Sequence, residues 1–261
     1  MKVLTLNVAN PSPAKADKQL EWLAARDDDL LVLTETGPGP GSQALADAFA
    51  FAGYATCWER PPADERGVLI ASRLGVAAVA PRLSYLPWRA CAARIGNPGI
   101  LVVGAYVPSR DTSEEKTARK RRFMTELCSW LDAQAGHDDR LILGDLNVVD
   151  RQHTPRYSFF QEWEYSFFDV LTNWGLVDAF RLMHPGGQEY SWVDRAGYGY
   201  RYDHTFVEGA ITDAVTTCSY LHETKHDQLS DHAAMSVEIS ILGETPRRQI
   251  GRLMSRQPVL F

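Results

Sequence analysis

The sequence has no excess of positive charge. Its 261 residues include 27 lysine and arginine residues against 33 aspartate and glutamate residues, which gives a formal net charge of -6 at pH 7. This balance excludes a domain that holds nucleic-acid phosphates by bulk positive charge. Any chemistry on a phosphate must therefore depend on a local site, where a bound metal ion would supply the missing positive charge.

Long apolar runs are missing too, and cysteine is scarce. No stretch approaches 18 consecutive apolar residues, which excludes a membrane-spanning helix. The N-terminus lacks the basic segment, apolar stretch and cleavage site of a signal peptide. The four cysteines, Cys57, Cys91, Cys128 and Cys218, lie far apart and without zinc-site spacing. We expect reduced thiols in a cytoplasmic protein.

The short motifs of several common chemistries are also absent. There is no P-loop, no GxGxxG after a strand, no HExxH and no GxSxG nucleophile elbow. The chain does have enough apolar sequence, 45% hydrophobic with 23% charged residues, to bury a full core. Its polar candidates for chemistry are carboxylates, amides and one histidine that come directly after apolar runs.

The apolar runs predict one mixed α/β domain over residues 1–242. Strands are expected at 3–6, 30–33, 68–71, 101–105, 141–143, 202–207 and 235–239, and helices at 14–26, 43–51, 113–133 and 159–174. Residues 243–261 differ in composition, because they hold four arginines against Glu244. Ile250, Leu253 and Met254 lie between these arginines at helical spacing, so we expect a basic tail with a short amphipathic helix that packs on the body.

The strongest local signal follows the predicted strand 141–143. Gly144 allows close backbone approach, and Asp145 and Asn147, two residues apart, point to the same side. A carboxylate and an amide placed in this way can hold a water, a metal ligand or a phosphate oxygen. An ordinary strand-ending turn has the same composition.

A second signal is Ser230-Asp231-His232, just before the strand 235–239. An aspartate beside a histidine can serve a metal ion and a reacting phosphate, because histidine titrates near neutral pH. Asp203 belongs to another strand, where alternation places it opposite Tyr202 and His204. Each of these residues could also be a capping or turn residue.

Three further polar residues come at the ends of apolar strands. Asn7 follows 3–6 and Glu35 follows 30–33, so the two could meet if their strands are neighbours. Hard oxygen ligands with few protein carboxylates are what Mg²⁺ prefers. Tyr106 ends the strand 101–105 and could place its hydroxyl at the same rim, or it could be a core aromatic.

The ordered set of these residues resembles the endonuclease/exonuclease/phosphatase superfamily over nearly the whole body. The set is Asn7, Glu35, Tyr106, Asp145 with Asn147, Asp203, and Asp231 with His232. The resemblance implies a four-layer α/β sandwich, in which two packed mixed β-sheets are flanked by helices and the site lies at one end of the sheets.

Within the superfamily, the sequence is most similar to the exonuclease III branch of abasic-site DNA endonucleases. The matching stretch runs from Trp174 through Tyr190-Ser191-Trp192 to Tyr200-Arg201-Tyr202-Asp203. The resemblance implies that Trp192, Tyr200 and Tyr202 line a small apolar pocket for an extruded abasic sugar, which a normal nucleotide would not fit. It also places Arg201 among the substrate-binding residues.

The resemblance also implies roles for the polar residues. Glu35 would ligate Mg²⁺, for which Mn²⁺ could substitute, with Asn7 and Asp231 close to the metal and the phosphate. Asp145 would position or deprotonate the attacking water, and Asn147 would orient it. His232, held by Asp203 and with Tyr106 beside it, would bind the scissile phosphate, so that cleavage leaves a 3′-hydroxyl.

Some positions depart from the pattern of that branch. Thr34 stands where glutamine is usual, Ala9 stands where a polar residue is common, and the segment 60–66 lacks the aromatic and basic DNA-contacting loop. A basic run in the helix 113–133, comprising Lys116, Arg119, Lys120, Arg121 and Arg122, could contact DNA phosphates or form a solvated helix face.

The resemblance therefore predicts a DNA phosphodiesterase that cleaves 5′ to abasic sites or removes 3′ nucleotides and blocking groups. The alternative is a member of the superfamily that acts on RNA, a nucleotide or another small phosphodiester. The expected partner is duplex DNA with an abasic site or a 3′ end, bound by a monomer. The last five residues, with Gln257, Leu260 and Phe261, resemble the bacterial sliding-clamp-binding pentapeptide, and they could equally anchor on the protein's own surface.

Overall fold

Two β-sheets organise the computed structural model, which describes residues 1–78, 83–96, 99–134, 136, 139–240, 251 and 253. Within these residues the first sheet has the strand order β13-β14-β1-β2-β4-β3. Its strands are β1 (Lys2–Asn7), β2 (Leu30–Thr36), β3 (Ala55–Trp58), β4 (Gly67–Ser72), β13 (Val215–Leu221) and β14 (Ala234–Ile239).

The second sheet has the order β5-β6-β7-β8-β12-β9. Its strands are β5 (Ala77–Ala78), β6 (Ala90–Ile95), β7 (Ile100–Tyr106), β8 (Asp139–Asp145), β9 (Val177–Asp178) and β12 (Asp203–Val207). A separate hairpin of β10 (Trp192–Val193) and β11 (Gly199–Tyr200) and a 3-10 turn, η1 (Pro87–Arg89), complete the extended part.

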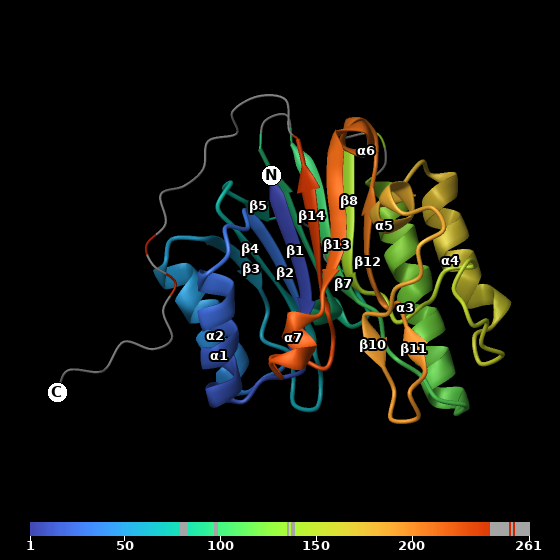
Figure 1. Ribbon diagram of the computed structural model, residues 1–261, viewed down its shortest axis with the longest axis horizontal. Coiled ribbons are helices and arrows are strands. Elements are labelled where there is room, and N and C mark those ends of the chain that lie inside the picture. Colours follow the sequence, from blue (N-terminus) through green and yellow to red (C-terminus); the bar gives the residue numbers. More distant parts are fainter. Residues whose placement is uncertain are drawn as a thin grey trace.

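Helices cover the outer faces of both sheets. α1 (Pro13–Ala24) and α2 (Pro40–Phe51) lie on the first sheet, and α3 (Glu114–Ala133) and α4 (Glu162–Asn173) lie on the second, as Figure 1 shows. The short helices α5 (Ala179–Met183), α6 (Ala210–Ala214) and α7 (Glu223–His226) occur in connections. The four-layer α/β sandwich predicted from the family resemblance is confirmed.

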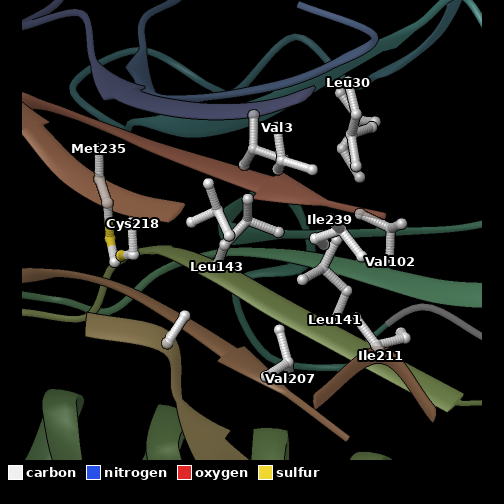
Figure 2. Packing of buried hydrophobic residues seen from close by; sticks show 14 of the residues in the cluster. Val3, Leu30, Val102, Leu141, Leu143, Val207, Ile211, Cys218, Met235 and Ile239 are labelled. Atoms are coloured by element: carbon white, nitrogen blue, oxygen red, sulfur yellow. The ribbon is translucent and has the colours of Figure 1, made fainter. Parts of the chain in front are cut away.

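The inner faces of the two sheets form the central core. Apolar side chains from β1, β2 and β14 meet those from β7, β8 and β12 between the sheets, as Figure 2 shows for Val3, Val102 and Leu143. Strands buried on both faces need apolar residues at every position, which explains the continuous runs in the sequence. Two further cores lie between each sheet and its helices.

The helices begin where the sequence supplies caps. Ser12 and Ser113 each accept a hydrogen bond from the backbone N–H three residues on, which satisfies one free donor of the first turn. α3 also has Glu114 and Glu115 in its first turn, where carboxylates interact favourably with the helix dipole. The four predicted helices are therefore confirmed, with ends that shift by a few residues.

The strands that the sequence did not predict are the outer or polar ones. β13 alternates exposed and buried residues, β3 is partly exposed along its length, and β6 is mostly only partly buried. β13 and β3 are at the two edges of the first sheet, where one side of the strand needs no apolar partner. No described helix is long and apolar enough to cross a membrane.

The tail contacts the body at the two positions that the structure describes. The Gly251 N–H donates to the Ala52 carbonyl, and Leu253 is buried against the α1 and α2 core. The rest of residues 243–261, including the predicted amphipathic helix and the pentapeptide with Gln257, Leu260 and Phe261, lies outside the described residues.

Candidate active site

The polar residues predicted from the sequence converge at one edge of the two sheets. β1 pairs in parallel with β2, and β7 pairs in parallel with β8, so the carboxyl ends of these strands meet at the same edge. The register places Asn7 opposite Thr34, and Asp145 opposite both Tyr106 and Asp203. This edge is the lower end in Figure 1, beside the hairpin β10–β11 and α7.

A tight turn after β8 presents Asp145 and Asn147. Gly144 has φ +139°, and a Cβ there would lie 2.1 Å from the Ala105 carbonyl oxygen, so a side chain does not fit. Asn147 is left-handed, with φ +48°, and its N–H donates to Asp145 Oδ1 over 3.0 Å. Its side-chain amide donates to the Val107 carbonyl over 3.0 Å. The turns after β7 and β8 are thus bonded to each other.

Asp145, Asn7, His232 and Asp203 form a buried chain of contacts. Asn7 Nδ2 donates to Asp145 Oδ2 over 2.9 Å and lies 3.4 Å from His232 Nε2. His232 Nδ1 lies 2.7 Å from Asp203 Oδ2. These residues come from β1, β8, β12 and the turn before β14. As expected from strand alternation, Asp203 faces this site while His204 faces away to Asp178.

Burial and neighbouring charges shift the pKa values of this chain in an informative way. Burial and the Asp203 carboxylate raise the pKa of Asp145 to about 8. Burial alone would lower the pKa of His232, but the adjacent Asp203 carboxylate outweighs it and raises that pKa to about 9. His232 is therefore an imidazolium at neutral pH, whereas Asp145 without a bound cation keeps its proton to a higher pH than an ordinary aspartate.

Glu35 and Tyr106 form a second part of the site. Glu35 lies at a bulge of β2 and has φ +56°. The Tyr106 hydroxyl donates to Glu35 Oε1 over 2.7 Å. Burial and the Glu35 and Asp145 carboxylates raise the pKa of Tyr106 well above its ordinary value, so it stays a neutral donor. The strands of Asn7 and Glu35 are neighbours, as the sequence analysis required.

The donor set of this edge fits a hard divalent cation. Glu35, Asn7 and Asp231 offer oxygen atoms, and the buried Asp203 Oδ1 has no hydrogen-bond partner. Among the described residues, no three His, Cys, Asp or Glu side chains form a group that could hold a metal ion by themselves. Mg²⁺ is commonly bound by one or two carboxylates with waters and substrate phosphates, so a complete cage is not required.

Aromatic rings are stacked beside the site. Trp192 is stacked on Tyr202, and Tyr202 on Tyr200, with ring centroids 5.9 and 5.1 Å apart. The Trp192 indole N–H also donates to Asp231 Oδ2 over 3.1 Å. Sequence reasoning did not identify Tyr157, whose ring centroid lies 4.6 Å from that of Tyr200. The three predicted pocket residues are thus brought together next to His232.

Arg201, predicted to bind substrate, is in the interior instead. It is 1% exposed and forms ion pairs with Asp150 and Asp178. Arg181 also pairs with Asp150, and Asp178 caps the N-terminus of α5. Arg201 and Tyr202 precede β12, so strand alternation does not decide where their side chains point, and the ion pairs with Asp150 and Asp178 hold Arg201 in the interior. A role of Arg201 in substrate binding stays a prediction.

The basic residues of α3 differ in their surroundings, and contact with DNA phosphates stays a prediction for the exposed ones, Lys116, Arg121 and Arg122. Lys120 is 1% exposed and paired with Glu164, Arg119 is paired with Glu65, and Lys116 is paired with Asp111. Several of these charges are thus already neutralised by acidic partners on other elements. Arg121 and Arg122 lie over aromatic rings of Trp163 and Tyr85.

The hydroxyl groups that support the site were not predicted individually. The buried Ser191 Oγ accepts hydrogen bonds from the N–H groups of Tyr202 and Asp203. The Thr224 hydroxyl donates to the His232 carbonyl over 2.8 Å and accepts from the Ala234 N–H. Serine and threonine are common surface residues, so their type gives no signal until the fold places them.

A family profile described as Endonuclease/Exonuclease/phosphatase family matches residues 4–232. The chain belongs to this family. Enzymes of the family that act as nucleases generally depend on a divalent metal ion. The family predicted from the ordered site residues is therefore confirmed.

Solved structures of the family resemble this chain over most of its length. A 3′–5′ exonuclease, NExo, from Neisseria meningitidis is 27% identical with a TM-score of 0.80, over 92% of this chain and 100% of that one. The 3′ phosphatase NExo from Neisseria, bound to a product DNA hairpin, is 27% identical with a TM-score of 0.79, over 92% of this chain and 99% of that one. An AP endonuclease from Archaeoglobus fulgidus, 24% identical with a TM-score of 0.78 over 92% and 100%, shows the same fold.

Proposed function

We propose that the protein is a Mg²⁺-dependent DNA phosphodiesterase of the exonuclease III type. It would cleave 5′ to abasic sites, or remove 3′ nucleotides and blocking groups. The observation that carries the proposal is the contact chain of Asp145, Asn7, His232 and Asp203 beside the stacked rings of Trp192 and Tyr202. Two relatives at 27% identity, a 3′ phosphatase bound to a DNA hairpin and a 3′–5′ exonuclease, support DNA as the substrate.

The side chains divide the work of in-line hydrolysis. Asp145, in its ionised form, accepts a proton from the attacking water, and the Asn147 and Asn7 amides orient the water and the phosphate. The water oxygen bonds to phosphorus as the bond to the leaving 3′ oxygen breaks. The His232 imidazolium donates a hydrogen bond to a phosphoryl oxygen, on which negative charge grows, while the Tyr106 hydroxyl donates to Glu35 and holds that carboxylate in place.

Glu35, with Asn7 and Asp231, would hold the divalent cation. When bound, the cation stabilises negative charge on the phosphate and on the leaving oxygen. Asp231 also accepts the Trp192 indole N–H, so the aromatic stack and this carboxylate hold each other in place. The edge then has a charged half that faces the phosphate and an apolar half that faces the sugar.

Trp192, Tyr200 and Tyr202 are proposed to select the sugar. A flipped abasic sugar presents a small apolar surface, which a stack of rings can cover. Trp192→Ala should lower abasic incision by about tenfold, because the apolar area that the indole buries against the sugar is lost, and should affect exonuclease activity less. Both rates are measured on the same duplex sequence, with and without an abasic analogue. Equal losses in both would count against the pocket.

The decisive experiment incubates the protein with a duplex that contains one abasic analogue. Incision 5′ to the lesion with Mg²⁺, abolished by EDTA and restored by Mg²⁺ or Mn²⁺, is the expected result. Parallel reactions contain an undamaged 3′ end, a 3′-phosphate, an RNA strand and a small phosphodiester. Hydrolysis confined to the RNA or the small phosphodiester would replace the proposal with the alternative function.

A sliding clamp is proposed as a partner of residues 257–261, on the resemblance of Gln257, Leu260 and Phe261 to the clamp-binding pentapeptide. Leu253, a few residues earlier, is buried against the α1 and α2 core, which ties the tail to the body. Deletion of residues 257–261 should abolish binding to a purified bacterial clamp and leave incision of naked DNA unchanged. Unaltered clamp binding would show that the pentapeptide is a surface anchor.

A further inference from the structure

Glu164, which is fully buried at the start of α4, lies at the centre of a charged network behind the candidate site. One carboxylate oxygen accepts from the Lys120 ammonium over 2.6 Å, and the other accepts from the Arg110 guanidinium and the Gln161 N–H. Burial alone would raise the pKa of Glu164, but the hydrogen bonds from Arg110 and Lys120 outweigh it and lower that pKa. The carboxylate is therefore charged, and both cations have a fixed partner.

Lys120 connects this carboxylate to the turn after β8. Its ammonium is 1% exposed and donates to the Asn147 carbonyl over 2.7 Å, as well as to Glu164. Asn147 is the left-handed residue whose N–H orients the Asp145 carboxylate. The buried Lys120 ammonium thus fixes the main chain of this turn through its hydrogen bond to the Asn147 carbonyl, two residues from Asp145.

Arg110 connects the same carboxylate to the turn after β7. Its side chain is 3% exposed, pairs with Glu164, and donates to the Phe159 carbonyl over 2.6 Å. Arg110 lies four residues after Tyr106, in the segment whose Val107 carbonyl accepts the Asn147 amide. Phe160, next to Phe159, contacts the ring of Tyr202. One carboxylate is therefore linked to both catalytic turns and to the aromatic stack.

We propose that Glu164 is a positioning residue for catalysis, which acts through Lys120 on the Asp145–Asn147 turn and through Arg110 on the turn after Tyr106. The proposal rests on the proposed hydrolytic function of these turns. A buried ion pair by itself is weak evidence for stability, since the cost of removing charges from water offsets their attraction. What this network supplies is a fixed position for two backbone turns, each of which carries groups that must be placed within a fraction of an ångström.

Lys120→Met is the sharpest test, because Glu164 keeps Arg110 as a partner and the fold is retained. We expect kcat to fall by about 10- to 100-fold with little change in KM, as for a small misplacement of catalytic groups. Amide hydrogen exchange in residues 144–149 should become about tenfold faster, while exchange in the first sheet stays unchanged. Exchange is measured without substrate.

Two further substitutions separate the two links. Arg110→Met leaves the Lys120–Glu164 pair intact, so it should lower kcat less than Lys120→Met and should speed exchange in residues 107–111. Glu164→Gln breaks both links and should lower kcat at least as much as Lys120→Met. Should Glu164→Gln fail to fold, the two single-link variants still decide the matter.

Arg140 provides the matched control. It is 2% exposed, pairs with Glu208 and donates to the Leu131 carbonyl, so it resembles Lys120 in burial and partners. It lies at the opposite end of β8 from Asp145. Arg140→Met should lower the thermal unfolding midpoint but leave kcat within about twofold, because distant sites act independently.

One result would overturn the proposal: Lys120→Met and Arg140→Met lose the same amount of kcat and show the same amide exchange rate at residues 144–149. If the wild-type protein hydrolyses no DNA, the proposed function fails, but the exchange measurement still tests the positioning role. If DNA is hydrolysed and the two variants differ only in stability, the proposed function stands and the positioning role is wrong.

Discussion

The fold contains two buried carboxylate clusters, one around Asp178 and one around Asp145, and their pKa values shift in opposite directions. In one, Asp178 and Asp150 meet the guanidinium of Arg201, and the pKa of each carboxyl is lowered because the arginine outweighs the effect of burial. In the other, Asp145 meets further carboxylates, and burial together with Asp203 raises its pKa to about 8. Both Asp145 and Asp178 are less than 10% exposed, so burial alone does not explain the difference.

The difference lies in which charges the chain itself supplies. Around Asp178, arginine and histidine side chains donate to the carboxylate oxygens, as a structural cluster requires. Around Asp145, one imidazolium faces several carboxylates, and the Asp203 Oδ1 atom has no hydrogen-bond partner. An under-compensated buried cluster at a sheet edge is the expected signature of a site that binds a cation and a phosphate.

Asp145→Asn should show the largest effect on activity. Loss of the proton acceptor should reduce hydrolysis by about 10³-fold, within the range for a general base. The free energy of unfolding should stay within about 1 kcal/mol of the wild-type value, because the substitution relieves repulsion between buried carboxylates. Activity on the abasic duplex and urea unfolding are measured on the same preparation. A large loss of stability would mean that this cluster is structural.

Asp178→Asn should show the opposite pattern. It leaves the Arg201 guanidinium without one of its charged partners and weakens the cap of α5, so the free energy of unfolding should fall by about 3–5 kcal/mol. At a temperature where the variant is folded, hydrolysis should change far less than for Asp145→Asn. An Asp178→Asn protein that is as stable as the wild type would remove the distinction between the clusters.

The dependence of stability on pH should distinguish the clusters further. Lowered pKa values for Asp150 and Asp178 mean that their contribution is present above the unfolded-state pKa of about 3.9 and is lost as the pH falls through the lower folded-state values. Below about pH 4 the wild-type protein should therefore lose stability more steeply than Asp178→Asn. Urea unfolding at a series of pH values measures the two slopes, and parallel slopes would contradict the assignment.

Tyr220→Phe should have the smallest effect, although this residue lies between the clusters. Its hydroxyl donates to the Asp203 carbonyl, and its ring packs against Phe180. Loss of one neutral hydrogen bond should cost about 1 kcal/mol of unfolding free energy, with kcat nearly unchanged. A loss of kcat comparable to that of Asp145→Asn would show that the two clusters are coupled.

The sequence predicted the inner strands and the outline of the site for physical reasons that also set its limits. Strands buried on both faces, such as β7 and β8, contain continuous apolar runs, and the polar residue that ends each one marks the sheet edge. Edge strands such as β13 have no such run, because one side is exposed. Arg201 belongs to the stretch that resembles the exonuclease III branch, but its burial between Asp150 and Asp178 depends on partners that are distant in the sequence.

Long-range charge pairing was the part that could not be predicted. Lys120 and Glu164 are 44 residues apart, and each is of a residue type that is expected on the exposed face of a helix. Only the packing of α3 against α4 shows that both are buried. The same holds for the hydroxyl of Ser191, since a serine is informative only when its neighbours in space are known.

The pairing of β1 with β14 has a consequence for how the protein is made. Asn7 leaves the ribosome 225 residues before His232, yet the two side chains lie side by side. Contacts of such sequence separation form late, after the intervening chain has been ordered. A nascent chain would therefore carry most of the fold without a complete site, and the candidate site would form only after the segment with His232 has emerged.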